Sequence, residues 1–212
     1  MIFSLGSNCT PSMNVHRHFQ IKPKSPFDWL VTPFDSIINI FSTDGTHFGK
    51  NISTELNGNT AYCENYGVFY HHEFKRRTDN ERVILDIESI NNCRGKLLFK
   101  YHRMIEICKI SKPIFIRYLS GTDVPTDRLG STLPLTLSDV ENLQEIIASK
   151  IFHNDFHILL VKSKSNKYDL INEGELLGMP NISVEYVQSN CSALEEAHSW
   201  DVMFNRLARA AT

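Results

Sequence analysis

The clearest strand-helix-strand pattern in the chain is residues 112–163, "KPIFIRYLSGTDVPTDRLGSTLPLTLSDVENLQEIIASKIFHNDFHILLVKS". It opens with a continuous apolar run at 112–120, which is typical of a buried strand. After a loop rich in Gly, Pro, Thr and Asp, a helix is predicted, for which Ser138 and Glu141 offer a capping box. A second apolar run follows at 156–163. A strand, a helix and a strand in this order predict parallel strands in one sheet.

The alternation of strands and helices continues outward from this unit. The segment "KLLFKYHRMIEICKI" (96–110) places Leu97, Tyr101 and Ile105 on one helical stripe. Residues 43–66, rich in Asn, Thr and Gly, are predicted to be loop. Further strands are predicted at 3–5, 66–74 and 182–188, and further helices near 11–20, from Pro33 or Asp35, and at 192–210, where Ser192 and Glu195 form a second capping box. We therefore expect a single α/β domain over 1–212, with a three-layer arrangement of a mostly parallel sheet and helices on both faces.

Composition and charge exclude several classes of function. The 212 residues carry 22 Lys and Arg against 24 Asp and Glu, a formal net charge of -2 that does not favour binding to nucleic acid or to an anionic membrane. No apolar run approaches the about 18 residues of a membrane span, and "MIFSLGSNC" lacks the pattern of a signal peptide. We therefore expect a cytoplasmic protein with no membrane and no nucleic-acid partner.

The cysteines and glycines argue against a disulfide framework and a bound nucleotide. Five scattered cysteines without a C-x-x-C pair predict reduced thiols: Cys9, Cys63, Cys93, Cys108 and Cys191. No glycine-rich phosphate loop is present in the sequence, so we expect no cofactor.

One cysteine lies at a predicted strand-to-helix corner, in "FSLGSNCTPS" (3–12). The turn residues Gly-Ser-Asn follow the first strand, and Thr10 can serve as N-cap with Pro11 at the first helical position. Cys9 would then lie beside the unpaired N–H groups and positive end of a helix, a position that tends to lower the pKa of a thiol. The alternative is that Cys9 is a small buried apolar residue.

Ligands of open parallel sheets bind beyond the carboxyl ends of the strands. This rule selects residues 7–10, 71–74, 120–123, 163–165 and 189–192. A cysteine nucleophile needs a base, and "FYHHEF" offers His71 and His72. Because neighbouring residues of a strand point to opposite faces, only one of the two is expected to face Cys9, and the periodicity leaves open which.

Three motifs resemble a bacterial family of unknown function whose members are predicted to be papain-like cysteine peptidases. They are "SLGSNC" (4–9), "PFDWLVTPFDS" (26–36) and the His-acid-Phe triplet at 72–74. The resemblance covers roughly the first 75 residues and continues more weakly through "IFIRY" and the helix that carries Trp200. It implies that Cys9 is the nucleophile and His72 the base of a peptidase.

The remaining site residues complete a hypothesis of acyl transfer or amide hydrolysis. Of the acids Asp28, Glu73, Asp86 and Asp123, we favour Asp28 as the group that orients the imidazole. Because papain's Cys-Gly-Ser-Cys-Trp motif and a preceding Gln are absent, backbone N–H groups and Asn8 would form the oxyanion hole. The predicted substrate-binding residues are Ser7, Asn8, Trp29, His71 and Asp123. The substrate class stays open among peptide, glycan and small acyl compound.

Other readings of the same residues remain. A flavodoxin-like serine esterase would use Ser7 with Glu195 and His198, although its Gly-Asp-Ser turn is missing. A binding domain would use the same strand ends without catalysis. The pairs His16/His18 and His153/His157 have spacings that could hold a metal, but neither has a third ligand in the sequence, so no metal is expected.

Overall fold

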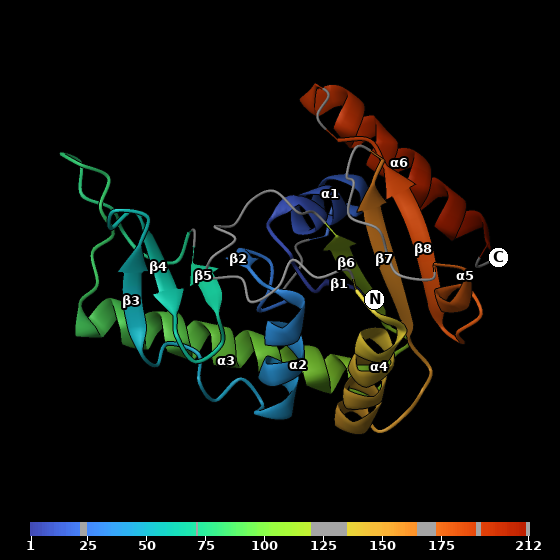
Figure 1. The fold of residues 1–212 in the computed structure, drawn as a ribbon, viewed down its shortest axis with the longest axis horizontal. Helices are drawn as coiled ribbons and strands as arrows, with labels where there is room; N and C mark the ends of the chain where they lie inside the picture. Colours follow the sequence, from blue (N-terminus) through green and yellow to red (C-terminus); the bar gives the residue numbers. More distant parts are fainter. Residues whose placement is uncertain (22–24, 71, 120–134, 165–172, 190–191, 211–212) are drawn as a thin grey trace.

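The computed structural model describes residues 1–21, 25–70, 72–119, 135–164, 173–189 and 192–210, and it contains two four-stranded sheets (Figure 1). The first sheet is parallel, in the order β1 (Ile2–Ser4), β6 (Ile114–Leu119), β7 (His157–Ser163) and β8 (Ile182–Val187). The second is antiparallel, in the order β2 (Leu30–Val31), β5 (Val68–Tyr70), β4 (Thr60–Cys63) and β3 (Ile52–Glu55). The expected α/β class with a parallel sheet is therefore confirmed.

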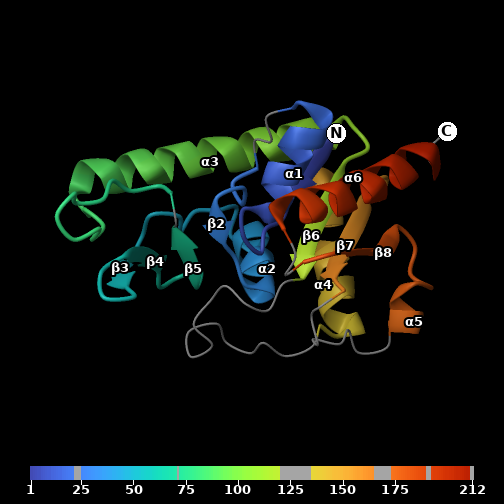
Figure 2. The same cartoon turned by 90° about the horizontal axis from the view of Figure 1, so that it is seen from above.

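The helices in the described part of the chain are α1 (Thr10–Phe19), α2 (Phe34–Ser42), α3 (Ile87–Lys109), α4 (Leu137–Ile151), α5 (Glu173–Leu176) and α6 (Ala193–Ala210). Figure 2 shows α1 and α6 side by side, and α3 extending from the region of the parallel sheet to the antiparallel one. Among the described residues, no helix combines the length and apolarity needed to cross a membrane.

Successive residues of the parallel strands enter two different hydrophobic cores. In β6, Phe115 belongs to one core, while Ile116 and Tyr118 belong to the other. Helices α1 and α6 supply Val15 and Trp200, among others, to the core of Ile116 and Tyr118. The larger core contains Phe115 and apolar residues of α2, α3, α4 and the antiparallel sheet. Because α3 contributes Leu97, Tyr101, Met104 and Ile105 to this core, the stripe predicted for its helix is buried.

The antiparallel sheet corrects the expectation of a mostly parallel arrangement. Residues 43–66, predicted to be loop, contain β3 and β4, and β5 pairs with β4 rather than with the parallel strands. The physical reason is the turn at 56–59, where Asn57 and Gly58 take positive φ of 59° and 87° and reverse the chain between two strands. The turn residues therefore mark a hairpin.

Two helices begin earlier than their sequence patterns predicted. Helix α4 is capped by Thr136 with Asp139, not by Ser138 with Glu141, and the earlier start lets Leu137 pack against the larger core. Helix α3 begins at Ile87, where Asp86 and Ser89 form a capping box. The capping box predicted for α6 is confirmed, because Ser192 and Glu195 exchange backbone and side-chain hydrogen bonds.

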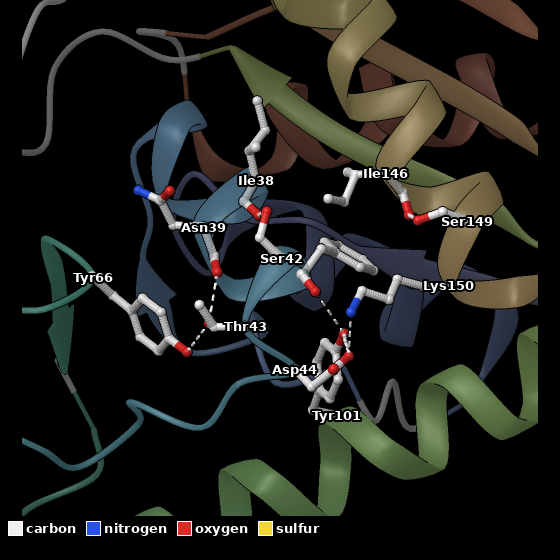
Figure 3. Close-up of polar contacts among 11 residues, drawn as sticks. Ile38, Asn39, Ser42, Thr43, Asp44, Tyr66, Tyr101, Ile146, Ser149 and Lys150 are labelled. Carbon is white, nitrogen blue, oxygen red and sulfur yellow. Dashed lines mark hydrogen bonds and ion pairs between the residues drawn. The ribbon is translucent and has the colours of Figure 1, made fainter.

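A polar cluster after α2 ties together helices and the antiparallel sheet (Figure 3). Asp44 accepts hydrogen bonds from Lys150 of α4 at 2.7 Å and from the Tyr101 hydroxyl of α3 at 3.2 Å. The neighbouring Thr43 hydroxyl is 2.6 Å from the Tyr66 hydroxyl, in the turn between β4 and β5. The end of α2 is thus held by contacts with α3, α4 and the turn between β4 and β5.

Candidate functional site

Cys9 occupies the N-cap position of α1, one residue earlier than the cap predicted from the sequence. Thr10 is the first helical residue and Pro11 the second, and the Cys9 carbonyl accepts the first helical hydrogen bond from Met13 at 2.9 Å. The Asn8 side chain accepts a hydrogen bond from the Thr10 N–H at 3.0 Å. Cys9 is half-buried. Cys9 therefore lies at the positive end of a helix and is partly exposed.

The loop that leads to Cys9 is held by both sheets. Leu5 and Gly6 continue from β1 along β6, where the Gly6 carbonyl accepts a hydrogen bond from Tyr118 N–H at 3.0 Å. The next carbonyl, of Ser7, accepts from the Thr32 N–H at 2.8 Å, directly after β2. Gly6 has φ of 81° and is close to the side chains of Thr32 and Arg117, so a glycine is required there. Ser7, Asn8 and Cys9 thus follow the carboxyl end of β1, as predicted.

Asp28 lies beneath the first turn of the helix that Cys9 begins. Its side chain is hydrogen bonded by the Ser12 hydroxyl of α1 and by the backbone of Ser25, and only 1% of the residue is exposed. Burial raises the pKa of Asp28 to about 7, against the lowering effects of the Lys100 charge and of these hydrogen bonds. Oδ1 has no hydrogen-bond partner among the described residues. Asp28 is therefore a buried carboxyl group that changes charge near neutral pH.

Trp29 and His72 meet at the surface beside Asp28. The antiparallel pairing of Leu30 with Tyr70 brings the residue before β2 close to the residues after β5. The Trp29 and His72 ring centroids are 5.4 Å apart with an interplanar angle of 83°. Both residues are exposed, Trp29 to 39%. The predicted base therefore lies next to the "PFDW" segment.

The predicted residues Cys9, Asp28 and His72 are linked through neighbouring residues that contact one another. Cys9 begins the helix of Ser12, Ser12 contacts Asp28, and the next residue after Asp28 packs on His72. The orientation of the His72 imidazole by Asp28 stays a prediction, since the partners found for Asp28 are Ser12 and Ser25. His71 and Asp123, predicted as substrate-binding residues, lie outside the described residues.

The other described thiols are chemically different from Cys9. Cys63, Cys93 and Cys108 are buried. Burial raises the pKa of all three thiols, in Cys93 and Cys108 to about 12. A thiol with so high a pKa is a poor nucleophile at neutral pH. Among the described residues, Cys9 is the cysteine placed for chemistry.

A buried arginine near this loop was not predicted from the sequence. Arg117 of β6 is 5% exposed, donates from Nη1 to the Leu5 carbonyl at 2.9 Å, and lies 5.8 Å from the centre of the Phe34 ring. Burial lowers the pKa of Arg117 to about 9, so it stays protonated at neutral pH. The available signal was a charged residue inside the apolar run "IFIRYL".

Residues of the alternative hypotheses, the serine esterase and the metal site, contact other groups of the protein. Glu195 accepts hydrogen bonds from the backbone and hydroxyl of Ser192, and His198 is exposed on α6. Of the four histidines with spacings that could hold a metal, three contact protein groups through their rings: His18 with Asp201, His153 with the Cys108 carbonyl, and His157 with Ser183. In the part of the chain that the structure describes, no three His, Cys, Asp or Glu residues are grouped to hold a metal ion.

Comparison with known proteins gives no relative: no family model, no curated protein and no solved structure matches the chain.

Proposed function

We propose that the protein is a cysteine-dependent hydrolase in which the Cys9 thiolate attacks the carbonyl carbon of an amide or related acyl bond. One observation carries the proposal: the partly exposed Cys9 is the N-cap of α1 at the carboxyl end of β1, whereas Cys63, Cys93 and Cys108 are buried. The positive end of a helix favours the thiolate, which is the nucleophilic form of cysteine.

In the proposed reaction, His72 takes the proton of the Cys9 thiol, and the sulfur forms a bond to the acyl carbon. When the amide C–N bond breaks, His72 returns the proton to the leaving amine. Water then hydrolyses the thioester and restores the thiol. We assign stabilisation of the oxyanion to a backbone N–H group at the start of α1 other than those of Thr10 and Met13, which donate to Asn8 and Cys9. Asp28 is assigned the role of positioning His72 through the contact of Trp29 with the imidazole.

The finer expectations from the sequence belong to the same proposal. The parallel sheet and the helices whose side chains fill its two cores would form a three-layer scaffold. The resemblance of the first 75 or so residues to predicted papain-like peptidases supports amide hydrolysis, and a cytoplasmic location is part of the same proposal. A formal net charge of -2 supports a peptide, glycan or small acyl substrate over nucleic acid.

The test is alkylation with iodoacetamide as a function of pH, read residue by residue by mass spectrometry. Because Cys191 lies outside the described residues, a Cys191→Ser background removes its thiol from the comparison. We expect Cys9 to react with a midpoint well below the pKa of about 8.5 of an ordinary thiol, and Cys93 to react far more slowly. Labelling of Cys9 no faster than of Cys93 would contradict the proposal.

Hydrolysis is tested with a library of peptide and acyl amide substrates. Replacing Cys9 by Ala should abolish any turnover while the circular dichroism spectrum stays that of the unmodified protein. A Cys63→Ala variant, which removes a buried thiol on β4, is the matched control for the loss of a sulfur. Turnover that survives Cys9→Ala would overturn the assignment of the nucleophile.

A further inference from the structure

Arg117 is a buried cation with no carboxylate partner among the residues that the structure describes. Burial is what lowers its pKa, with no contribution from a carboxylate in the part of the chain that the structure describes. Its Nη1 donates to a backbone carbonyl, but its Nε has no hydrogen-bond partner among those residues. A buried charge and a buried donor without partners are both unfavourable, and a structure that keeps them often uses them.

A second orphaned polar group lies on the other side of the same loop. Thr32 is buried, and its Oγ1 has no hydrogen-bond partner in the described part of the chain. Both side chains flank Gly6: a Cβ on this glycine would lie 3.3 Å from Arg117 Nη1 and 3.3 Å from Thr32 Oγ1. Two groups that can donate hydrogen bonds are therefore gathered at one point of the loop that leads to Cys9.

This point is at the edge of the sheet where ligands of parallel sheets bind. Arg117 is near the carboxyl end of β6, and Gly6 follows the carboxyl end of its neighbour β1. Cys9 lies three residues after Gly6 and begins α1. A substrate bound at Cys9 would therefore meet a loop that these two donors flank three residues earlier in the chain.

We propose that Arg117 and Thr32 recognise a carboxylate on the substrate, so that the enzyme acts on acyl compounds that carry a negative charge close to the bond that is cleaved. The planar guanidinium matches the two oxygens of a carboxylate, and a hydroxyl donates one further hydrogen bond. The substrate carboxylate would supply the missing counter-charge. This inference rests on the proposed role of Cys9 as nucleophile.

The test compares iodoacetate with iodoacetamide as probes of Cys9 in the Cys191→Ser background. In both reactions the thiolate sulfur forms a bond to the CH₂ carbon and the C–I bond breaks with loss of iodide. The two reagents therefore differ only in the group next to the CH₂ carbon, which is a carboxylate in iodoacetate and an amide in iodoacetamide. We expect the ratio of the iodoacetate to the iodoacetamide rate constant at Cys9 to exceed that of glutathione by about tenfold. A ratio equal to that of glutathione would overturn the inference.

Variants test whether Arg117 causes the preference of Cys9 for iodoacetate over iodoacetamide. Arg117→Met should lower the ratio to the value for glutathione, and Arg117→Lys should restore part of it. Arg103→Met, which removes an exposed cation of α3, is the matched control and should keep the wild-type ratio. If Arg117→Met lowers both rate constants by the same factor, the arginine acts on the thiolate and not on the anion, and the inference is wrong.

The outcomes separate this inference from the proposed function. Slow reaction of Cys9 with iodoacetamide in the unmodified protein contradicts the nucleophile itself. Fast reaction with iodoacetamide without a preference for iodoacetate contradicts only the recognition of an anion. If Arg117→Met does not fold, the inference is tested on Cys9 of the protein with Arg117 intact, by comparing its rate ratio with that of glutathione. A Thr32→Val variant gives a second test, because it should also lower the ratio of the iodoacetate to the iodoacetamide rate constant.

Discussion

The Ser12 hydroxyl of α1 forms a hydrogen bond with the buried side chain of Asp28, one turn into the helix that begins at Cys9. This contact joins the segment that carries the thiol to the segment that carries Trp29. Since Asp28 is almost fully buried and its pKa is raised to about 7, the protonation of this carboxyl group affects both the stability of the fold and the surroundings of the helix start.

The pH dependence of stability follows from Asp28. Its pKa in the folded protein is about 7, above the ordinary 3.8, so the folded state binds more protons than the unfolded state between these values. The free energy of unfolding should therefore fall as the pH rises from about 4 to about 7, by roughly 2–4 kcal/mol for this group alone. Urea unfolding at several pH values measures the slope.

The matched control is Asp28→Asn, which keeps the shape and cannot ionise. We expect this variant to show a smaller loss of stability between pH 4 and pH 7, and to be more stable than the unmodified protein at pH 8. Identical slopes for the two proteins would show that Asp28 stays charged in the folded state.

Replacing His72 by Ala should raise the pH midpoint of Cys9 alkylation and slow the reaction at pH 6.5 by about tenfold or more, because the thiolate would lose its proton acceptor. The measurement is the rate of iodoacetamide labelling at Cys9 from pH 5 to pH 9. His102→Ala is the matched control, since His102 is also an exposed histidine in edge contact with an aromatic ring, that of Tyr101. Equal effects of the two substitutions would remove His72 from the site, and loss of activity on replacing His71 would assign the base there.

The position of Cys9 could be predicted from the sequence because its signals are local. A short apolar strand, a turn of small residues and Pro11 define the corner without reference to the rest of the chain. The meeting of Trp29 and His72 could not be predicted in the same way, because it depends on the pairing of β2 with β5 across a long stretch of chain.

The burial of Arg117 and the second sheet could not be predicted from local sequence patterns, for related reasons. An arginine in an apolar run can lie at a surface or in a core, and only the packing of Phe34 and Leu5 around it decides between them. The hairpin of β3 and β4 has polar residues on one strand and Asn-Gly in its turn, so its composition resembles that of a loop.

The contact between α1 and α6 provides a test of a charged network. Asp201 accepts hydrogen bonds from Arg17 at 2.7 and 2.8 Å and contacts His18 at 2.6 Å, and these partners hold its pKa below the ordinary value. Asp201→Ala should therefore lower the free energy of unfolding by about 1 kcal/mol at pH 7. Because the pKa of Asp201 is lowered, the contribution should be lost as the pH falls below about 4.

The control is Asp155→Ala, which removes one partner of the isolated surface pair with Lys112. Both side chains of that pair are mostly exposed, so the change should be close to zero. Urea midpoints of both variants at pH 7 and pH 3 give the comparison. A cost for Asp201→Ala that persists unchanged at pH 3 would show that the contact acts through packing.

Substitutions of Trp200 separate the contribution of ring packing in the smaller core from that of the indole N–H group. Trp200 is fully buried against Tyr118 and Phe204, yet its Nε1 has no hydrogen-bond partner in the described part of the chain. Trp200→Ala should cost about 3–5 kcal/mol, the price of a large cavity. Trp200→Phe should cost much less, because it keeps an aromatic ring in contact with both neighbours and removes a buried donor that lacks a partner. Thermal and urea unfolding of the two variants measure the difference, and a Phe variant as unstable as the Ala variant would contradict the expectation that the retained ring contacts keep most of the stability.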